Sequence, residues 1–226
     1  MELRRYVAIP AVYEYLINHV FSFFDVKEIY RVIDLGAGSG AFINFLSRYY
    51  PYWHIEGADN ENFVEFGLKD RFKFTRVDLN KSFSRSIKGK FDLITAIEVI
   101  EHLENPRHFL RECNKLLKVG GKLIITPPNI ESIPGRLRFL VRGNFKHFDS
   151  DPKFNEPTHI TPIQSYLFSR AARDTGFRVI KQFYFPPGKF YGSRSIVKIA
   201  ALIISPFLHG HKFGEKNIFL LEKING

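Results

Sequence analysis

The chain has 226 residues, 45% hydrophobic and 25% charged, which is enough for one globular domain with a full-sized core. Its single cysteine, Cys113, excludes an internal disulfide framework and fits a reducing compartment, so we expect a cytoplasmic protein without a signal peptide. The net charge of +10 fits either an anionic partner or a basic surface that binds nothing. Because the basic residues are scattered along the chain, they weaken a nucleic-acid interpretation.

The first half of the chain alternates between strand-like and helix-like segments. An amphipathic helix is predicted over roughly residues 10–24, within an amino-terminal cap of residues 1–30. The strand-like runs that follow are residues 30–35, 53–59, 71–79, 91–97 and 122–128. The helix-like runs are residues 40–50 and 105–119, the second ended by Gly120 and Gly121. This alternation predicts an α/β fold, a three-layer sandwich around a mostly parallel sheet.

The second half breaks the alternation. Residues 177–185 and 217–224 are strand-like and bring the predicted sheet to seven strands. Residues 127–161 carry proline, glycine and basic residues, and we expect a lid-like insertion within a single domain that spans residues 1–226. The apolar run IVKIAALIISPFL, residues 196–208, is too short for a bilayer, which takes roughly twenty apolar residues. We expect a buried crossover helix there, with a dimer contact or a membrane-surface element as the alternatives.

A glycine loop follows the first predicted strand. Gly36, Gly38 and Gly40 have G-x-G-x-G spacing ahead of a helix, where the backbone turns sharply and free N–H groups meet a ligand. Asp59 and Asp78 end the second and third predicted strands, where carboxylates can accept hydrogen bonds from a ribose and an adenine. Either aspartate alone is better explained as a turn or cap residue at a strand end. Their recurrence at successive strand ends predicts a nucleotide site.

The stretch TAIEVIEHLENP, residues 95–106, places Glu98, Glu101 and His102 at positions i, i+3 and i+4. If a helical turn begins where the fourth strand ends, all three project from one face. His159 precedes the helix that leads to the sixth strand, and it can fold back over the same pocket. Two carboxylates and two imidazoles suit a divalent cation, with Mg²⁺, Mn²⁺, Fe²⁺ and Zn²⁺ all open. Alternatively, the glutamates favour a helix start, and His102 or His159 acts as a catalytic general base.

The loop and strand ends resemble those of class I S-adenosylmethionine-dependent methyltransferases, most clearly over residues 32–128. The two closing strands match the antiparallel hairpin that separates this Rossmann-like methyltransferase fold from nicotinamide-binding sheets. The resemblance implies S-adenosyl-L-methionine as cofactor, with Asp59 at its ribose, Asp78 at its adenine and Asp34 beneath the loop. The cofactor-binding positions that it implies are Asp34, Gly36, Ala37, Gly38, Gly40, Asp59, Asp78, Leu79 and Glu98.

E-x-x-E-H followed by a distant histidine resembles two groups in particular, the small-RNA 3′-end 2′-O-methyltransferases and the ubiquinone-pathway catechol O-methyltransferases. The resemblance implies a metal, Mg²⁺, that holds two neighbouring oxygens of a diol and lowers the pKa of the hydroxyl. The implied ligands are Glu98, Glu101, His102 and His159. The pattern also occurs in methyltransferases of cell-surface sugar and lipid pathways, so the requirement for a metal stays open.

Residues 127–148 resemble a linker found in methyltransferases of glycan and lipid biosynthesis, and they mix basic with apolar side chains. Such a segment can grip an anionic sugar, a lipid head group or RNA, or it can simply pack on the sheet. We therefore expect O-methylation of a small-molecule, glycan or lipid-precursor hydroxyl, with peripheral membrane contact left open. The alternatives are a ribose 2′-O-methyltransferase acting on RNA and an NAD-dependent oxidoreductase.

Overall fold

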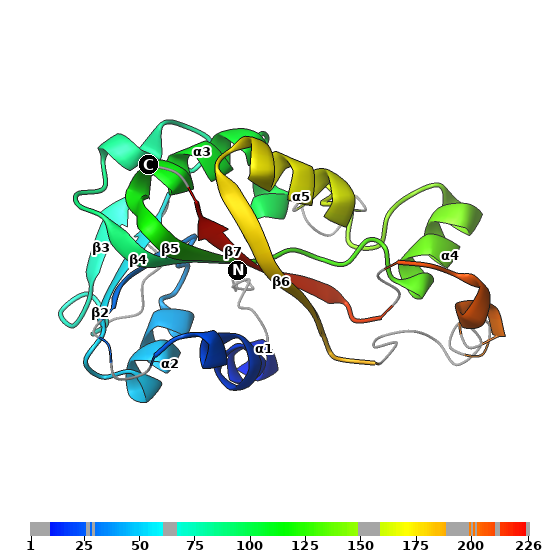
Figure 1. Ribbon diagram of the computed structural model, residues 1–226, viewed down its shortest axis with the longest axis horizontal. Helices are drawn as coiled ribbons and strands as arrows, with labels where there is room; N and C mark the ends of the chain where they lie inside the picture. Colours follow the sequence, from blue (N-terminus) through cyan, green and yellow to red (C-terminus); the bar gives the residue numbers. More distant parts are fainter. Residues whose placement is uncertain are drawn as a thin grey trace, which may run out of the picture.

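The computed structural model describes residues 10–25, 28, 30–60, 67–148, 159–188, 199, 201, 203–210 and 213–224. These residues contain a seven-stranded sheet of order β3-β2-β1-β4-β5-β7-β6 (Figure 1). The strands are β1 (Arg31–Leu35), β2 (His54–Asp59), β3 (Lys73–Arg76), β4 (Phe91–Ile97), β5 (Leu117–Thr126), β6 (Phe177–Phe185) and β7 (Lys216–Lys223). Neighbouring strands from β3 to β5 are parallel, and β7 is antiparallel to both β5 and β6. The predicted fold class is confirmed.

Helices cover both faces of the sheet (Figure 1). One face carries α1 (Pro10–Tyr15), continued by a π turn (Leu16–Val20) and a 3₁₀ turn (Phe21–Phe23), together with α2 (Ala41–Tyr49). The other face carries α3 (Pro106–Leu116) and α5 (Ser165–Asp174). Short 3₁₀ turns, η3 (Phe83–Arg85), η4 (Ile100–His102) and η5 (Ser205–Phe207), lie in the connections. A last helix, α4 (Ile133–Arg142), lies apart from both layers at one end of the molecule.

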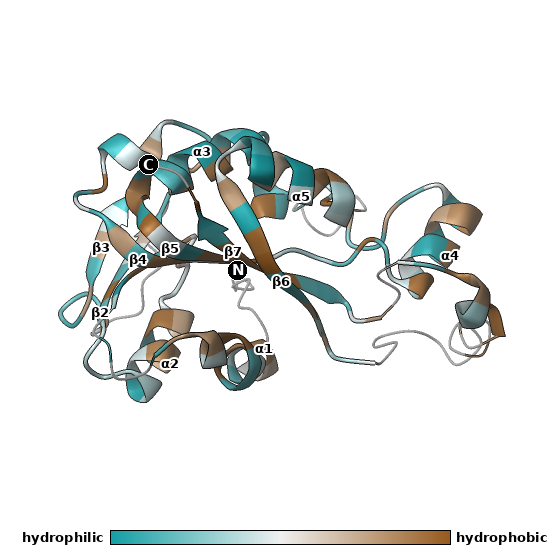
Figure 2. Cartoon of the chain, in the orientation of Figure 1, coloured by the Kyte–Doolittle hydropathy of each residue, from teal (hydrophilic) through white to brown (hydrophobic). Residues whose placement is uncertain are grey.

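The core has two layers, one on each face of the sheet. Alternate residues of β4 enter opposite layers, because successive side chains of a strand point to opposite faces. Ile94 and Ala96 pack with the α3 and α5 layer, whereas Leu93 and Ile97 pack with the α1 and α2 layer. Figure 2 shows the hydrophobic residues running along the central strands between the helices. Burial on both faces explains why most residues of β4 are apolar.

The boundary between α3 and β5 differs from the prediction. We expected Gly120 and Gly121 to end the helix, but α3 ends at Leu116 and β5 begins at Leu117. Leu117 is 1% exposed and pairs with Phe91 of β4, before a register shift in this strand pair. Gly120 lies within β5 and has a φ of +76°. Strand pairing of a buried leucine therefore outweighs continuation of the helix.

The apolar run at 196–208 is described only at residues 199, 201 and 203–208. Ala201 is fully buried, but Ile199, Ile203 and Phe207 are 59%, 66% and 81% exposed. The prediction of a buried crossover helix is therefore wrong for these three side chains. Among the residues that the structure describes, no helix combines the length and apolar character needed to cross a membrane.

Candidate active site

The loop between β1 and α2 is fixed by the end of β2. The backbone N–H groups of Gly36 and Ala37 both donate to the carbonyl oxygen of Ala58, at 2.7 and 3.1 Å. Gly36 has a φ of +74°, and a Cβ atom there would lie 2.4 Å from Cγ2 of Val99. Gly38 has a φ of +52°, but a Cβ atom there would meet nothing within 4 Å among the described atoms. The loop is thus closely packed at Gly36 and open at Gly38, where a ligand can approach its backbone.

Two of the predicted aspartates lie at the strand ends beside this loop. Asp59 ends β2, and its Oδ2 accepts a hydrogen bond from the backbone N–H of Gly38 at 2.8 Å. Asp34 is 3% exposed, and its Oδ1 accepts from the hydroxyl of Thr95 on β4 at 2.6 Å. Burial raises the pKa of Asp34 to about 7, and the nearby charge of Asp59 adds to this rise. Asp34 therefore joins β1 to β4, two residues before Gly36.

Asp78 lies at the same edge of the sheet. The backbone N–H of Val77, just before it, donates to the carbonyl of Asp59 at 2.8 Å. One carboxylate oxygen of Asp78 accepts from the N–H of Asn80 at 3.0 Å, and this hydrogen bond is the main reason that its pKa is lowered. The hydrogen bond from Asn80 is that of a turn residue, which is the alternative that the sequence left open for Asp78. Leu79, the next predicted cofactor position, is 7% exposed and packs in the α3 and α5 layer.

Glu98 directly follows β4 and adopts a φ of +57°. Its N–H donates to the Thr126 hydroxyl at 3.0 Å, that hydroxyl donates back to Oε1, and Lys216 pairs with Oε2. Burial raises the pKa of Glu98, and the Lys216 charge opposes the rise. The predicted helical turn through Glu98 is wrong, because the turn is the 3₁₀ segment Ile100–His102 and Glu98 precedes it in a left-handed conformation. Its carboxylate pairs with Lys216 instead of joining Glu101 and His102.

The structure brings Glu101, His102 and His159 together. One potential ligand atom of each residue lies within 4.8 Å of those of the other two. The two imidazole rings are 4.7 Å apart between centroids, at an interplanar angle of 71°. The segment of His159 is held here because the N–H groups of Ile160 and Thr161 donate to the carbonyl of Glu101, at 2.9 and 3.0 Å. The cluster therefore contains three of the four predicted metal ligands, without Glu98.

The cluster contains buried polar atoms that lack partners. Glu101 is fully buried, and neither its carboxylate oxygens nor Nδ1 of His159 has a hydrogen-bond partner among the described residues. Burial, followed by the charge of Glu98, holds the pKa of Glu101 well above its usual range. Burial and the neighbouring His102 lower the pKa of His159 to about 4, so its imidazole is neutral at pH 7. A bound cation or a hydroxyl ligand would satisfy these atoms and relieve the burial penalty.

Two further residues of this region, Lys216 and Tyr13, were not predicted from the sequence. Lys216 begins β7 and bridges to Pro128, which follows β5. No local motif marks it, but an antiparallel strand beside β5 must begin where β5 ends. Tyr13 is 6% exposed, and burial together with the charges of Asp34 and Glu98 raises the pKa of its hydroxyl. The amphipathic pattern of the first helix predicts that it packs, but not that it packs beside the site.

Comparisons with known proteins agree with this arrangement. A family described as a methyltransferase domain matches residues 11–182. The demethylmenaquinone methyltransferase of Thermotoga maritima is 32% identical over 116 residues, covering 47% of this chain and 48% of that protein. A ubiquinone biosynthesis O-methyltransferase of Xanthomonas oryzae pv. oryzae is 26% identical over 112 residues, covering 44% and 43%. The matched part thus spans less than half of these curated relatives.

Solved structures match over nearly the whole chain. A methyltransferase from Archaeoglobus fulgidus gives a TM-score of 0.64 at 20% identity, covering 95% of this chain and 93% of that one. A second, from Clostridium acetobutylicum, gives 0.65 at 13% identity, covering 97% and 94%. At these identities the likeness concerns the fold. With the family match over most of its length, the chain belongs to the class I S-adenosylmethionine-dependent methyltransferases, a family that implies S-adenosylmethionine as cofactor.

Proposed function

We propose that the protein transfers the methyl group of S-adenosylmethionine to a hydroxyl of a small-molecule, glycan or lipid-precursor acceptor. The observation that carries the proposal is the cluster of Glu101, His102 and His159, whose buried unpartnered atoms lie just beyond the carboxyl end of β4. The loop at Gly38 follows β1, the parallel neighbour of β4. Ligands of such sheets bind beyond the carboxyl ends of the strands. A methyl donor at the loop and an acceptor at the cluster would therefore be neighbours.

The reaction would be an in-line displacement at the sulfonium methyl, for which the hydroxyl must lose its proton and align with the methyl group. His159, with a pKa lowered to about 4, is a weak base but a good hydrogen-bond acceptor. We assign to it the orientation of the hydroxyl. His102, the second imidazole of the cluster, is then the candidate general base. Glu101 would orient the acceptor or neutralise a cation beside it.

A divalent cation fits the same atoms. Glu101, His102 and His159 would hold it, while Glu98 is engaged by Lys216. When bound, such an ion lowers the pKa of a coordinated hydroxyl. Two imidazoles and one carboxylate suit Mn²⁺, Fe²⁺ or Zn²⁺ better than Mg²⁺, which prefers oxygen ligands. We therefore propose a transition-metal ion ahead of the Mg²⁺ that the resemblance implies.

The name of one relative, a ubiquinone biosynthesis O-methyltransferase, supports a hydroxyl acceptor. The name of the other, a demethylmenaquinone methyltransferase, does not specify an oxygen acceptor. Each match covers less than half of the relative. For this chain we therefore propose only the chemical class of the acceptor, a hydroxyl compound, and not a particular substrate. The cytoplasmic location stays a prediction.

The test has a binding arm and a transfer arm. Titration calorimetry with S-adenosylmethionine and with NAD should show binding of the first, weakened by Asp59→Ala, which removes the acceptor of the Gly38 N–H. Binding of NAD with no response to S-adenosylmethionine would overturn the proposal. Glu101→Ala, with and without a chelator, should abolish methyl transfer and leave cofactor binding intact. Full transfer by that variant would show that the cluster is structural.

A further inference from the structure

The end of the molecule that carries α4 presents apolar side chains to solvent. Leu140 and Val141 are 80% and 79% exposed, and Phe139 beside them is 47% exposed. On the neighbouring segment, Ile203 and Phe207 are one helical turn apart and are 66% and 81% exposed. Single exposed apolar residues are ordinary on protein surfaces, but a group of this size marks an interaction surface.

The two segments form one surface. Nη1 of Arg136, on α4, donates to the carbonyl of His209 at 2.9 Å, and its Nε donates to the carbonyl of Glu131 at 2.7 Å. Figure 1 shows α4 and the segment through η5 together at the end of the molecule farthest from β2 and β3. Figure 2 shows hydrophobic residues on both. We call residues 136–142 and 203–209 the docking surface.

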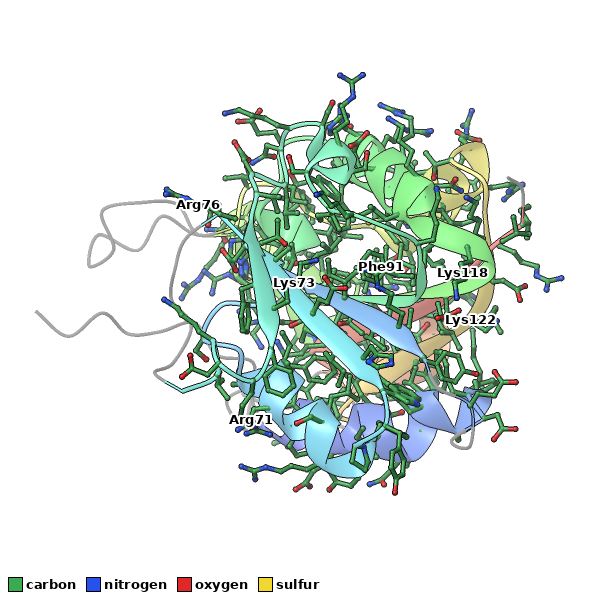
Figure 3. The ribbon with its side chains drawn as sticks, turned by 90° about the vertical axis from the view of Figure 1, so that its left-hand side faces the viewer. Arg71, Lys73, Arg76, Phe91, Lys118 and Lys122 are labelled. Carbon is green, nitrogen blue, oxygen red and sulfur yellow. The ribbon has the colours of Figure 1, made fainter. Side chains whose placement is uncertain are left out.

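The described segments of the docking surface carry basic side chains and no acidic ones. Residues 133–148 contain three arginines and one lysine, and neither they nor residues 203–210 contain an aspartate or glutamate. The opposite edge of the molecule is different. Figure 3 labels Lys73 on β3 and Lys118 and Lys122 on β5, and each is paired with a carboxylate at 2.6, 2.7 and 3.0 Å. At the α4 end Lys146 is paired as well, with Glu215. The exposed Arg142 follows directly after the exposed Leu140 and Val141, so positive charge and apolar side chains coincide on the docking surface.

We propose that the docking surface binds the face of an anionic lipid bilayer. Leu140, Val141 and Phe207 would enter the boundary between head groups and acyl chains, and Arg142 would contact lipid phosphates. Apolar and basic side chains without acidic ones are the combination by which interfacial helices bind anionic membranes. A second copy of the chain would bring the same positive charges face to face. RNA would leave the aliphatic side chains without a partner, since bases stack on aromatic rings.

A row of rings leads from this surface to the candidate active site. Phe139 stacks on Phe145 at 4.7 Å between ring centroids, and Phe145 contacts Phe148 edge-on at 6.4 Å. The ring centroid of Phe148 lies 5.4 Å from that of His159. An amphiphilic acceptor held in the bilayer could therefore extend its head along an apolar path to the cluster. This last step rests on the proposed function, whereas binding to the bilayer does not.

The experiment is sedimentation of the full-length protein with vesicles of phosphatidylcholine, with and without phosphatidylglycerol. We expect binding to the anionic vesicles and little to phosphatidylcholine alone. Leu140→Ser with Val141→Ser should weaken that binding by about tenfold or more, because two apolar side chains no longer enter the interface. Arg142→Glu should weaken it as well, and added salt should reduce the binding of wild type.

Matched controls distinguish binding through the docking surface from non-specific binding through exposed apolar or basic residues elsewhere. Tyr52→Ser with Val119→Ser removes two apolar side chains that are 80% and 66% exposed elsewhere, and it should leave binding unchanged. Arg48→Glu, at an exposed position of α2, should weaken binding less than Arg142→Glu. Because all these side chains are exposed, we expect every variant to keep the wild-type thermal unfolding temperature.

Three outcomes would overturn the proposal. The first is no binding to anionic vesicles, or binding that Leu140→Ser with Val141→Ser leaves intact. The second is a dimer in light scattering that this double variant dissociates, since a second copy would then occupy the surface. The third is RNA binding that Arg142→Glu abolishes while vesicle binding is absent. Methyl transfer is not measured here, so failure of the proposed function would leave these results unaffected.

Discussion

The ammonium group of Lys216 forms an ion pair with the carboxylate of Glu98, 118 residues away in the sequence. The pair joins the beginning of β7 to the end of β4, and the two side chains are only 15% and 20% exposed. The Lys216 charge also lowers the pKa of both Glu101 and His159. Lys216 therefore favours a charged Glu101 and a neutral His159, the two forms that can accept a hydrogen bond or bind a cation.

The first prediction concerns this ion pair. Lys216→Met should lower the rate of methyl transfer by about tenfold or more, because it frees Glu98 and removes a positive charge beside Glu101. The affinity for S-adenosylmethionine, measured by calorimetry, should change much less. Lys122→Met is the matched control, since it breaks a similar ion pair with Glu222, with side chains 21% and 19% exposed, away from the site. Both variants should unfold about 1–2 kcal/mol more easily, and equal transfer rates for the two would contradict a role for Lys216 in the reaction.

The second prediction compares the loss of the Glu101 charge, in the cluster, with the loss of the charge of a buried glutamate elsewhere, Glu112. Glu101→Gln keeps the shape of the side chain but removes its charge, and we expect about a hundredfold or greater loss of methyl transfer. Binding of Mn²⁺, followed by calorimetry, should weaken in parallel. The control is Glu112→Gln, because Glu112 is also fully buried but is hydrogen-bonded to Ser84 and paired with Lys115. It should affect the free energy of unfolding and not transfer; equal transfer by the two variants would refute the assignment.

The third prediction concerns the pH dependence of stability. Burial raises the pKa of Asp34 from 3.8 to about 7, so the folded protein holds this proton more tightly than the unfolded chain does. The resulting stabilisation is fully present below about pH 4 and is lost as the pH rises through about 7, a change of about 4 kcal/mol. Asp34→Asn keeps an acceptor for the Thr95 hydroxyl but does not titrate. Urea unfolding at several pH values should show a larger fall in stability over this window for wild type than for the variant, in which the buried Glu98 and Glu101 still titrate.

If the two proteins lose stability equally over that window, the charged form of Asp34 is not disfavoured by the fold. Asp34→Ala is a useful companion, because it also removes titration but leaves the buried Thr95 hydroxyl without its acceptor. It should be less stable than Asp34→Asn at every pH by about 1–3 kcal/mol.

The fourth prediction tests the packing of the cofactor loop. Gly36→Ala should lower the free energy of unfolding by about 1–3 kcal/mol, since its Cβ would lie 2.4 Å from Cγ2 of Val99 and the φ is +74°. Adding Val99→Ala removes that conflict, because only the Val99 Cβ remains, at 3.5 Å. The double variant should thus lose less stability than the sum of the single variants. Additive losses would show that backbone strain alone requires the glycine.

The companion variant is Gly38→Ala. Its Cβ would meet no described atom within 4 Å, so only the φ of +52° opposes it, at about 1 kcal/mol. If the open side of the loop receives the cofactor, this variant should bind S-adenosylmethionine more weakly than Gly36→Ala combined with Val99→Ala. The reverse order of affinities in calorimetry would contradict that placement.

Much of the fold could be predicted because its signals are local. Predicted strands 91–97 and 177–185 agree with β4 and β6, since apolar runs bounded by turn residues define buried strands. The end of α3 could not be predicted, because Leu117 is apolar and compatible with either a helix or a strand. Its pairing with Phe91, a contact between distant residues, decides the boundary.

The site was predictable to the extent that its residues stand at strand ends. Glu101, His102 and His159 follow from the motif and from the expectation that a distant histidine folds back. The left-handed conformation of Glu98 could not be foreseen, because a non-glycine residue rarely adopts a positive φ and no local pattern requires one. Lys216 depends on strand order, and Tyr13 depends on how the first helix packs.

The central claim is that a methyl group passes from the cofactor loop to a hydroxyl at the cluster of Glu101, His102 and His159. The most direct measurement uses S-adenosylmethionine labelled in its methyl group, a total cell extract as the source of acceptors, and wild type beside Glu101→Gln. We predict label in a product that survives mild base, as a methyl ether does and a methyl ester does not. We predict none with Glu101→Gln, although that variant still binds the cofactor. Undiminished label with Glu101→Gln, or label that mild base releases completely, would contradict the account.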